Sequence, residues 1–194
     1  MSNLDTPSKV GGKPAVDAAD LWTPLAPDAV AEIWPRLSQA LGKRIGKQSS
    51  TRIAERPLSF LPQTGHGNGR LLRLRQGQGI SRRTRYAVLL SDDTTLLIRF
   101  SPGLIADLNR LDALSLTPET LADYLQFYWQ FTAHGREPRS VEELTAKQID
   151  NGAWRVTGSW SEAGRSKPFA ALIQGDGSIE FGTIQPNDPQ GGIS

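Results

Sequence analysis

The sequence predicts an α+β fold in which helices pack on antiparallel β-meanders. Three observations lead to this prediction. The spacing of apolar residues changes along the chain from helical to strand-like, back to helical, and to strand-like again. Capping residues followed by proline stand where two of the helical stretches begin. Glycine-rich turns separate the strand-like stretches, and a sheet of this kind can curve into a cone.

Length and composition indicate one domain with two tails. A chain of 194 residues is long enough to bury a core without a metal or a disulfide, and we expect a single α+β domain over residues 21–186. Residues 1–20 and 187–194 carry too few apolar side chains to offset the entropy of ordering, so we expect flexible tails. No segment resembles a signal peptide or a membrane span, and we expect a cytoplasmic protein.

The first predicted helix lies within residues 27–46, where apolar residues recur at helical spacing. Pro35 interrupts this stripe, because proline removes a helical hydrogen bond and clashes with the preceding turn. We therefore expect either a kink at Pro35 or two short helices that meet there.

The segment that follows predicts strands. From Arg70 onward leucine and arginine alternate, as in a half-buried strand with one solvent-exposed face. Residues 83–100 then indicate a hairpin whose loop lies near Asp92. Because apolar residues occupy both faces of its first strand, over 86–90, we expect the hairpin to be central and covered on both sides.

Helices are predicted in the middle of the chain. Ser101 and Thr117 are each followed by proline, and we expect each pair to start a helix. The helix after Thr117 carries apolar residues almost all round, which favours burial between layers. Ser140 with Glu143 matches a capping box, so we expect a short third helix there.

The last third of the chain predicts strands again. Apolar residues of one parity fall in 154–160, 169–173 and 179–181. Turn residues separate these runs at 162–167 and 175–178. The pattern predicts a three-stranded antiparallel meander.

An uneven charge distribution is the feature that points to function. Residues 52–90 hold eight basic residues and one acid, a net charge of +7, whereas residues 91–194 hold eight basic residues and fourteen acids, a net charge of −6. Such asymmetry marks either an anion-binding face or internal pairing between the two segments. The candidate partner-binding residues are Arg70, Arg73, Arg75, Arg82, Arg83 and Arg85.

We expect a non-enzymatic binding or accessory protein that docks this arginine-rich hairpin on the anionic surface of a protein partner or larger assembly. The alternative partner is RNA or single-stranded DNA, which such proteins bind with aromatic side chains exposed among the charges. Near the arginines only Tyr86 is aromatic, and its apolar neighbours indicate burial. Exposed rings beside the arginines would favour nucleic acid, and a flat cationic face without rings would favour a protein.

A second alternative is an enzyme or small-ligand carrier with an aromatic-lined cavity between the helix after Thr117 and the C-terminal sheet. The same aromatic side chains would otherwise fill the core. The candidate cavity residues are Tyr124, Tyr128, Trp129, Trp154 and Trp160.

Residues with catalytic or cofactor chemistry are scarce. The chain has no cysteine, and its two histidines, His66 and His134, lack partners at metal-ligand spacing. The phosphate-loop-like stretch 42–49 has too short a spacing between its glycines and follows a helix rather than a strand. We therefore predict no catalytic residue, no cofactor and no metal. The oligomeric state is not predicted.

Overall fold

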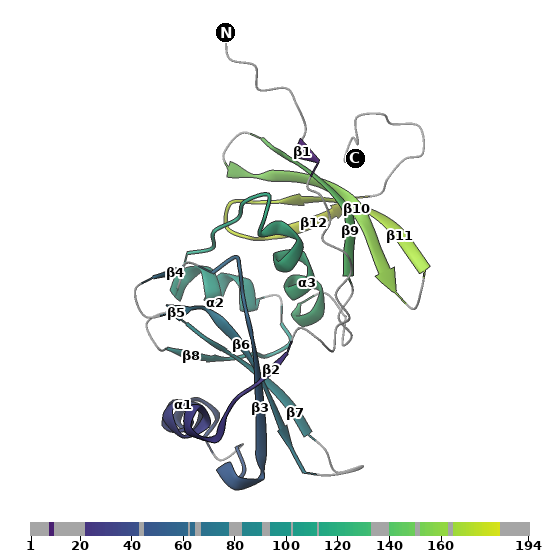
Figure 1. Cartoon of the computed structure of the whole chain (residues 1–194). Coiled ribbons are helices and arrows are strands. Elements are labelled where there is room, and N and C mark those ends of the chain that lie inside the picture. Colours follow the sequence, from purple (N-terminus) through teal and green to yellow (C-terminus); the bar gives the residue numbers. More distant parts are fainter. Residues whose placement is uncertain are drawn as a thin grey trace. The chain divides into compact units, whose positions relative to one another are not determined.

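A computed structural model shows three α-helices and two five-stranded antiparallel sheets within the described residues (Figure 1). Helices contact strands, which confirms the predicted α+β fold. None of the described helices is long and apolar enough to cross a membrane. The structure describes residues 8–9, 22–42, 45–61, 63–64, 67–77, 83–90, 94–101, 103–111, 113–132, 140–149, 152–162 and 165–182.

Contacts between Cα atoms divide the chain into two compact units. Residues 17–100 form one, here called the arginine unit, and residues 101–194 with 1–16 form the other, here called the aromatic unit. The expectation of a single domain over 21–186 stays a prediction. So do the flexible tails, because 1–20 and 187–194 lie outside the described residues except for Ser8–Lys9, which pairs with a strand of the aromatic unit.

The sheet of the arginine unit has the strand order β2-β3-β6-β7-β8, and all neighbouring strands are antiparallel. The predicted strand from Arg70 and the hairpin after it are β6, β7 and β8. Sequence analysis did not identify β3. The bounds are Thr23–Pro24 (β2), Thr51–Pro57 (β3), Arg70–Gln76 (β6), Arg83–Leu89 (β7) and Thr95–Leu97 (β8), with a two-residue pair Gln63–Thr64 (β4) and Gly67–Asn68 (β5) and a 3-10 turn Gln48–Ser50 (η2) beside them.

Helix α1 spans Pro27–Leu41 as one element, with Pro35 inside it. The two-helix alternative is therefore wrong. Pro35 cannot donate to the carbonyl of Ala31, but both residues are exposed, so water can donate to that oxygen instead. The Ser38 hydroxyl also donates to the Pro35 carbonyl at 2.8 Å.

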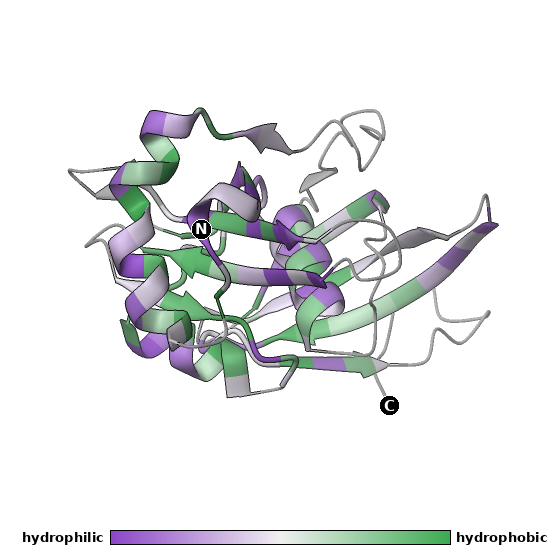
Figure 2. Ribbon diagram, turned by 90° about the horizontal axis from the view of Figure 1, so that it is seen from below, coloured by the Kyte–Doolittle hydropathy of each residue, from purple (hydrophilic) through white to green (hydrophobic). Residues whose placement is uncertain are grey.

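The core of the arginine unit lies between α1 and one face of its sheet. The apolar stripe of α1 packs on leucine and isoleucine side chains that alternate along β3, β6 and β7. Strand β7 changes from hydrophilic residues at its start to hydrophobic residues at its end, and Figure 2 shows strands with such a change along their length. The buried members are Val30, Ile33, Leu37, Leu41, Ile53, Leu72, Leu74, Ala87 and Leu89.

The aromatic unit is built on a sheet of strand order β1-β9-β10-β11-β12 with two helices. The predicted C-terminal meander is confirmed as β10, β11 and β12. The bounds are Ser8–Lys9 (β1), Ser140–Gln148 (β9), Trp154–Glu162 (β10), Arg165–Ile173 (β11), Ile179–Gly182 (β12), Gly103–Leu111 (α2) and Leu121–Phe131 (α3).

Two predicted helix starts are corrected. Residues from Ser140 form strand β9 and not a helix, because pairing with β10 gives these backbone groups partners that override the local capping pattern. The sheet is irregular here: Glu143 has a φ of 52°, in a bulge opposite Gly158. Helix α3 begins at Leu121, with Thr120 as its N-cap, and residues 118–120 before it form a turn in which the Thr117 carbonyl accepts from the Thr120 and Leu121 amides.

The turn between β11 and β12 is held in place by a hydrogen bond from α3 and by close packing. The Tyr124 hydroxyl, from α3, donates to the Gly177 carbonyl. Gly177 has a φ of 85°, and an added Cβ would lie 2.4 Å from Leu114 and 2.9 Å from Ile105. Only glycine therefore fits both the backbone conformation and the space.

We predict that Gly177→Ala destabilises the protein more than Gly152→Ala. Both glycines have a positive φ, but an added Cβ at Gly152 meets nothing within 4 Å. Backbone strain costs about 1–2 kcal/mol at either position, and overpacking adds about 1–3 kcal/mol at Gly177 alone. Urea unfolding of both variants measures the difference, and equal losses would show that the turn is not wedged.

Candidate functional site

The pairing of β6 with its neighbours determines which arginines lie together. Residues directly opposite each other in an antiparallel pair point to the same face of the sheet. Arg75 lies opposite Arg52 of β3 and Thr84 of β7, and Arg73 lies opposite Tyr86. These five residues share one face, here called the basic face. Arg52 is exposed and the other two arginines are half-buried.

The other three candidate arginines that the structure describes lie on the opposite face, toward α1. Arg85 is opposite Leu74, which packs in the α1 core, and Arg83 is opposite Gln76. Arg70 belongs to the same face and donates to Glu55 at 2.8 Å. The six predicted arginines are therefore not brought together in one patch: Arg73 and Arg75 are on the basic face, Arg70, Arg83 and Arg85 are on the other, and Arg82 lies outside the described residues.

Three aromatic rings lie beside the arginines of the basic face. The Arg73 guanidinium carbon is 4.3 Å from the centre of the Trp22 ring, which is 6.1 Å from the Tyr86 ring. Phe100 meets Tyr86 edge-on, with ring centres 6.5 Å apart, and is 62% exposed. We call Trp22, Tyr86 and Phe100 the ring cluster. Only Tyr86 was identified from the sequence as an aromatic residue near the arginines, because the other two rings lie outside the arginine-rich stretch.

The described strand residues of the basic face include arginines but no acid. Among the described residues of β3, β6 and β7 that point to this face, none is acidic. Arg52 and Arg75 stand directly opposite each other, and like charges in that position destabilise a strand pair. The Nε of Arg75 is buried and no described residue accepts a hydrogen bond from it. This arrangement costs stability, which an anion bound on the face would offset.

The predicted aromatic cavity residues pack largely against one another. Trp129 lies 5.2 Å from Trp160, which stacks on Phe169 with ring centres 4.4 Å apart. Trp154 and Tyr124 are buried. Burial raises the pKa of Tyr124 far above its ordinary value, so its hydroxyl stays protonated and keeps its hydrogen bond to the turn.

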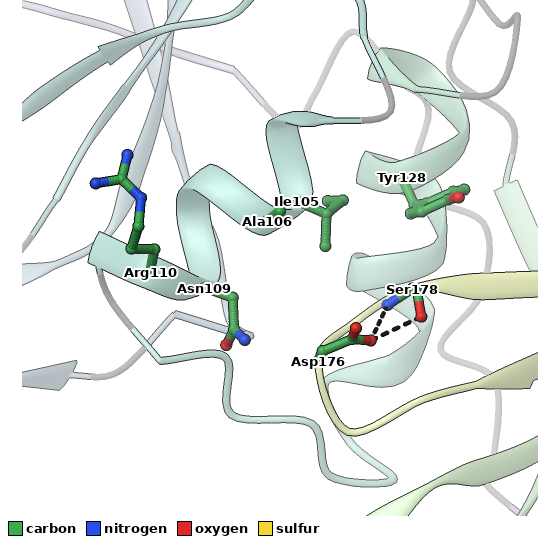
Figure 3. A pocket seen from close by; sticks show the side chains of 7 residues that line it. All are labelled: Ile105, Ala106, Asn109, Arg110, Tyr128, Asp176 and Ser178. Atoms are coloured by element: carbon green, nitrogen blue, oxygen red, sulfur yellow. Dashed lines mark hydrogen bonds between the residues drawn. The ribbon is translucent and has the colours of Figure 1, made fainter.

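A hollow of about 340 Å³ lies between α2, α3 and the turn before β12 (Figure 3). It shares only Tyr128 with the predicted cavity, and the ligand-binding hypothesis stays a prediction. The Asp176 carboxylate, which points toward Ser178 in Figure 3, accepts from the Ser178 amide at 2.8 Å and its hydroxyl at 2.7 Å. These hydrogen bonds lower the pKa of Asp176. The lining residues are Ile105, Ala106, Asn109, Arg110, Tyr128, Asp176 and Ser178.

Candidate metal ligands do not gather in the part of the chain that the structure describes. No group of three or more histidine, aspartate or glutamate side chains there is placed to hold a metal ion. The two histidines considered in the sequence, His66 and His134, lie outside the described residues.

The function is inferred from these residues and not from similarity to known proteins. No protein-family model, curated protein or solved structure matches the chain. The basic face with its ring cluster is the described feature with the most specific chemistry. It combines the opposed guanidinium groups of Arg52 and Arg75 with the exposed Phe100, in a unit whose opposite sheet face is covered by α1.

Proposed function

We propose that the protein is a non-enzymatic binding protein that docks an anionic partner on the basic face of the arginine unit. The observation that carries the proposal is the pair Arg52 and Arg75, which lie directly opposite each other on a face where the described residues of β3, β6 and β7 include no acid. Natural proteins keep arrangements that lower stability mainly where function needs them. An anion bound between two guanidinium groups would form charge-assisted hydrogen bonds with both.

The charge of the whole unit supports this proposal. Residues 17–100 hold thirteen basic residues and seven acids, a net charge of +6. Such a field attracts polyanions over a distance and speeds their association. Arg70 pairs with Glu55 at 2.8 Å, and that pair lies on the face toward α1. The basic face is therefore the part of the unit best suited to an anionic partner.

We predict that Arg52→Gln weakens polyanion binding several-fold and that Arg83→Gln does not. Both arginines are exposed and both changes remove one positive charge, but the two residues point to opposite faces of the sheet. Losing one charge-assisted contact costs about 1 kcal/mol or more, which is about a five-fold loss of affinity. Fluorescence anisotropy with labelled heparin and labelled polyglutamate measures both variants. Equal losses would show that only net charge matters, and the basic face would lose its role.

The same variant should leave the fold intact. Because Arg52 stands opposite Arg75, replacing it by glutamine removes a repulsion, and we expect the free energy of unfolding to stay equal or rise by a few tenths of a kcal/mol. Urea unfolding of wild type and Arg52→Gln measures this. A loss above about 1 kcal/mol would instead indicate that Arg52 pairs internally with an acid, the structural alternative raised by the charge asymmetry.

A further inference from the structure

We infer that the anionic partner of the basic face is a single-stranded nucleic acid, with at least one base stacked on the ring cluster and phosphates held by Arg52 and Arg75. The inference deepens the proposed function and rests on it. The aromatic rings support this inference, because a protein can bind a polyanion through charge alone and does not need rings to do so. Proteins that bind single strands without sequence preference combine a cationic groove with rings on which bases stack.

Phe100 is the stacking platform. This residue is 62% exposed, the largest exposed fraction among the large apolar residues that the structure describes. Single exposed apolar residues are common, but Phe100 also contacts Tyr86, which shares the basic face with Arg73 and Arg75. An exposed apolar ring that contacts a residue of the basic face fits a ligand that carries both flat bases and phosphates. An acidic protein surface would use the charges and leave the ring in water.

Trp22 and Arg73 form a second contact surface of the same kind. The guanidinium of Arg73 lies over the Trp22 ring, which fixes the orientation of both groups through a cation–π contact. A guanidinium plane held in this way stacks on bases and donates to phosphates, whereas a lysine ammonium does neither in a fixed plane. Ring and charge are thus interleaved across the face.

The geometry favours a single strand over a duplex. Stacking on a protein ring requires a base that is not stacked within a double helix. Duplex DNA is read mostly by an α-helix or a β-ribbon that enters its major groove, but α1 packs on the opposite face of this sheet. Arg52, Arg75 and Tyr86 lie on β3, β6 and β7, which spans two strand spacings, about 10 Å. A short stretch of a few nucleotides covers that distance.

The experiment measures binding of fluorescein-labelled U12, dT12, a 12-base-pair duplex and polyglutamate by anisotropy at several salt concentrations. We expect U12 or dT12 to bind more tightly than both the duplex and polyglutamate. Phe100→Leu keeps an apolar side chain but removes the ring, and should weaken binding of the single strand by about 5- to 100-fold with little change for polyglutamate. Phe100→Trp should retain binding. Phe181→Leu, which changes an exposed phenylalanine of the aromatic unit, is the matched control and should have no effect.

The salt dependence and the variants distinguish the nucleic-acid inference from the more general proposal that the basic face binds an anionic partner. Arg52→Gln should flatten the slope of log affinity against log salt for U12 by about 0.7, the value for one phosphate contact on a single strand. If Arg52→Gln weakens polyglutamate and heparin while Phe100→Leu leaves U12 binding unchanged, the nucleic-acid inference is overturned and the proposed function stands. If neither substitution changes binding of any polyanion, both fail. Tighter binding of the duplex than of the single strands would also overturn the inference.

Discussion

The antiparallel register of β6 against β3 and β7 is the constraint on which the arginine unit depends. Side chains alternate between the two faces of a strand, so a shift by one residue would move every side chain to the other face. In the observed register Leu72 and Leu74 enter the α1 core while Arg73 and Arg75 emerge on the basic face. Burial of the leucines therefore determines where the arginines point. The same strand pairing therefore places the leucines in the hydrophobic core and the arginines on the candidate binding surface.

This coupling explains how the protein tolerates an unfavourable charge arrangement. Burial of the leucine and isoleucine side chains under α1 stabilises the sheet, by about 1.5–3 kcal/mol for each fully buried side chain. Repulsion between opposed like charges such as Arg52 and Arg75 is smaller, of the order of 0.2–1 kcal/mol. The sheet can thus carry cations side by side on one face because the other face holds it together.

The aromatic side chains of the aromatic unit differ in their contacts from those of the ring cluster. Its rings mostly contact one another, as in the stack of Trp160 on Phe169, and the Tyr124 hydroxyl ties α3 to the turn at Gly177. Rings that pack against one another in this way mainly stabilise the core. The ring cluster of the arginine unit differs because its outermost ring, Phe100, remains mostly in water. The difference in exposure, rather than the number of rings, makes the second group the better candidate for binding.

The sequence by itself determined the fold class and most elements, because apolar periodicity reports directly which face of a helix or strand is buried. The stripe of α1, the alternation along β6 and the C-terminal meander were all visible in this way. The strand at Ser140 was not, since its capping pattern is local, whereas its strand partner is Ser161, at the far end of the β9–β10 hairpin. Tertiary structure alone decided which arginines share a face. Parity relates residues within one strand, but the faces of different strands are related only by register, and register is set by pairing and core burial. For the same reason Trp22 and Phe100, which flank the arginine-rich stretch at a distance in the sequence, join it only in the folded sheet.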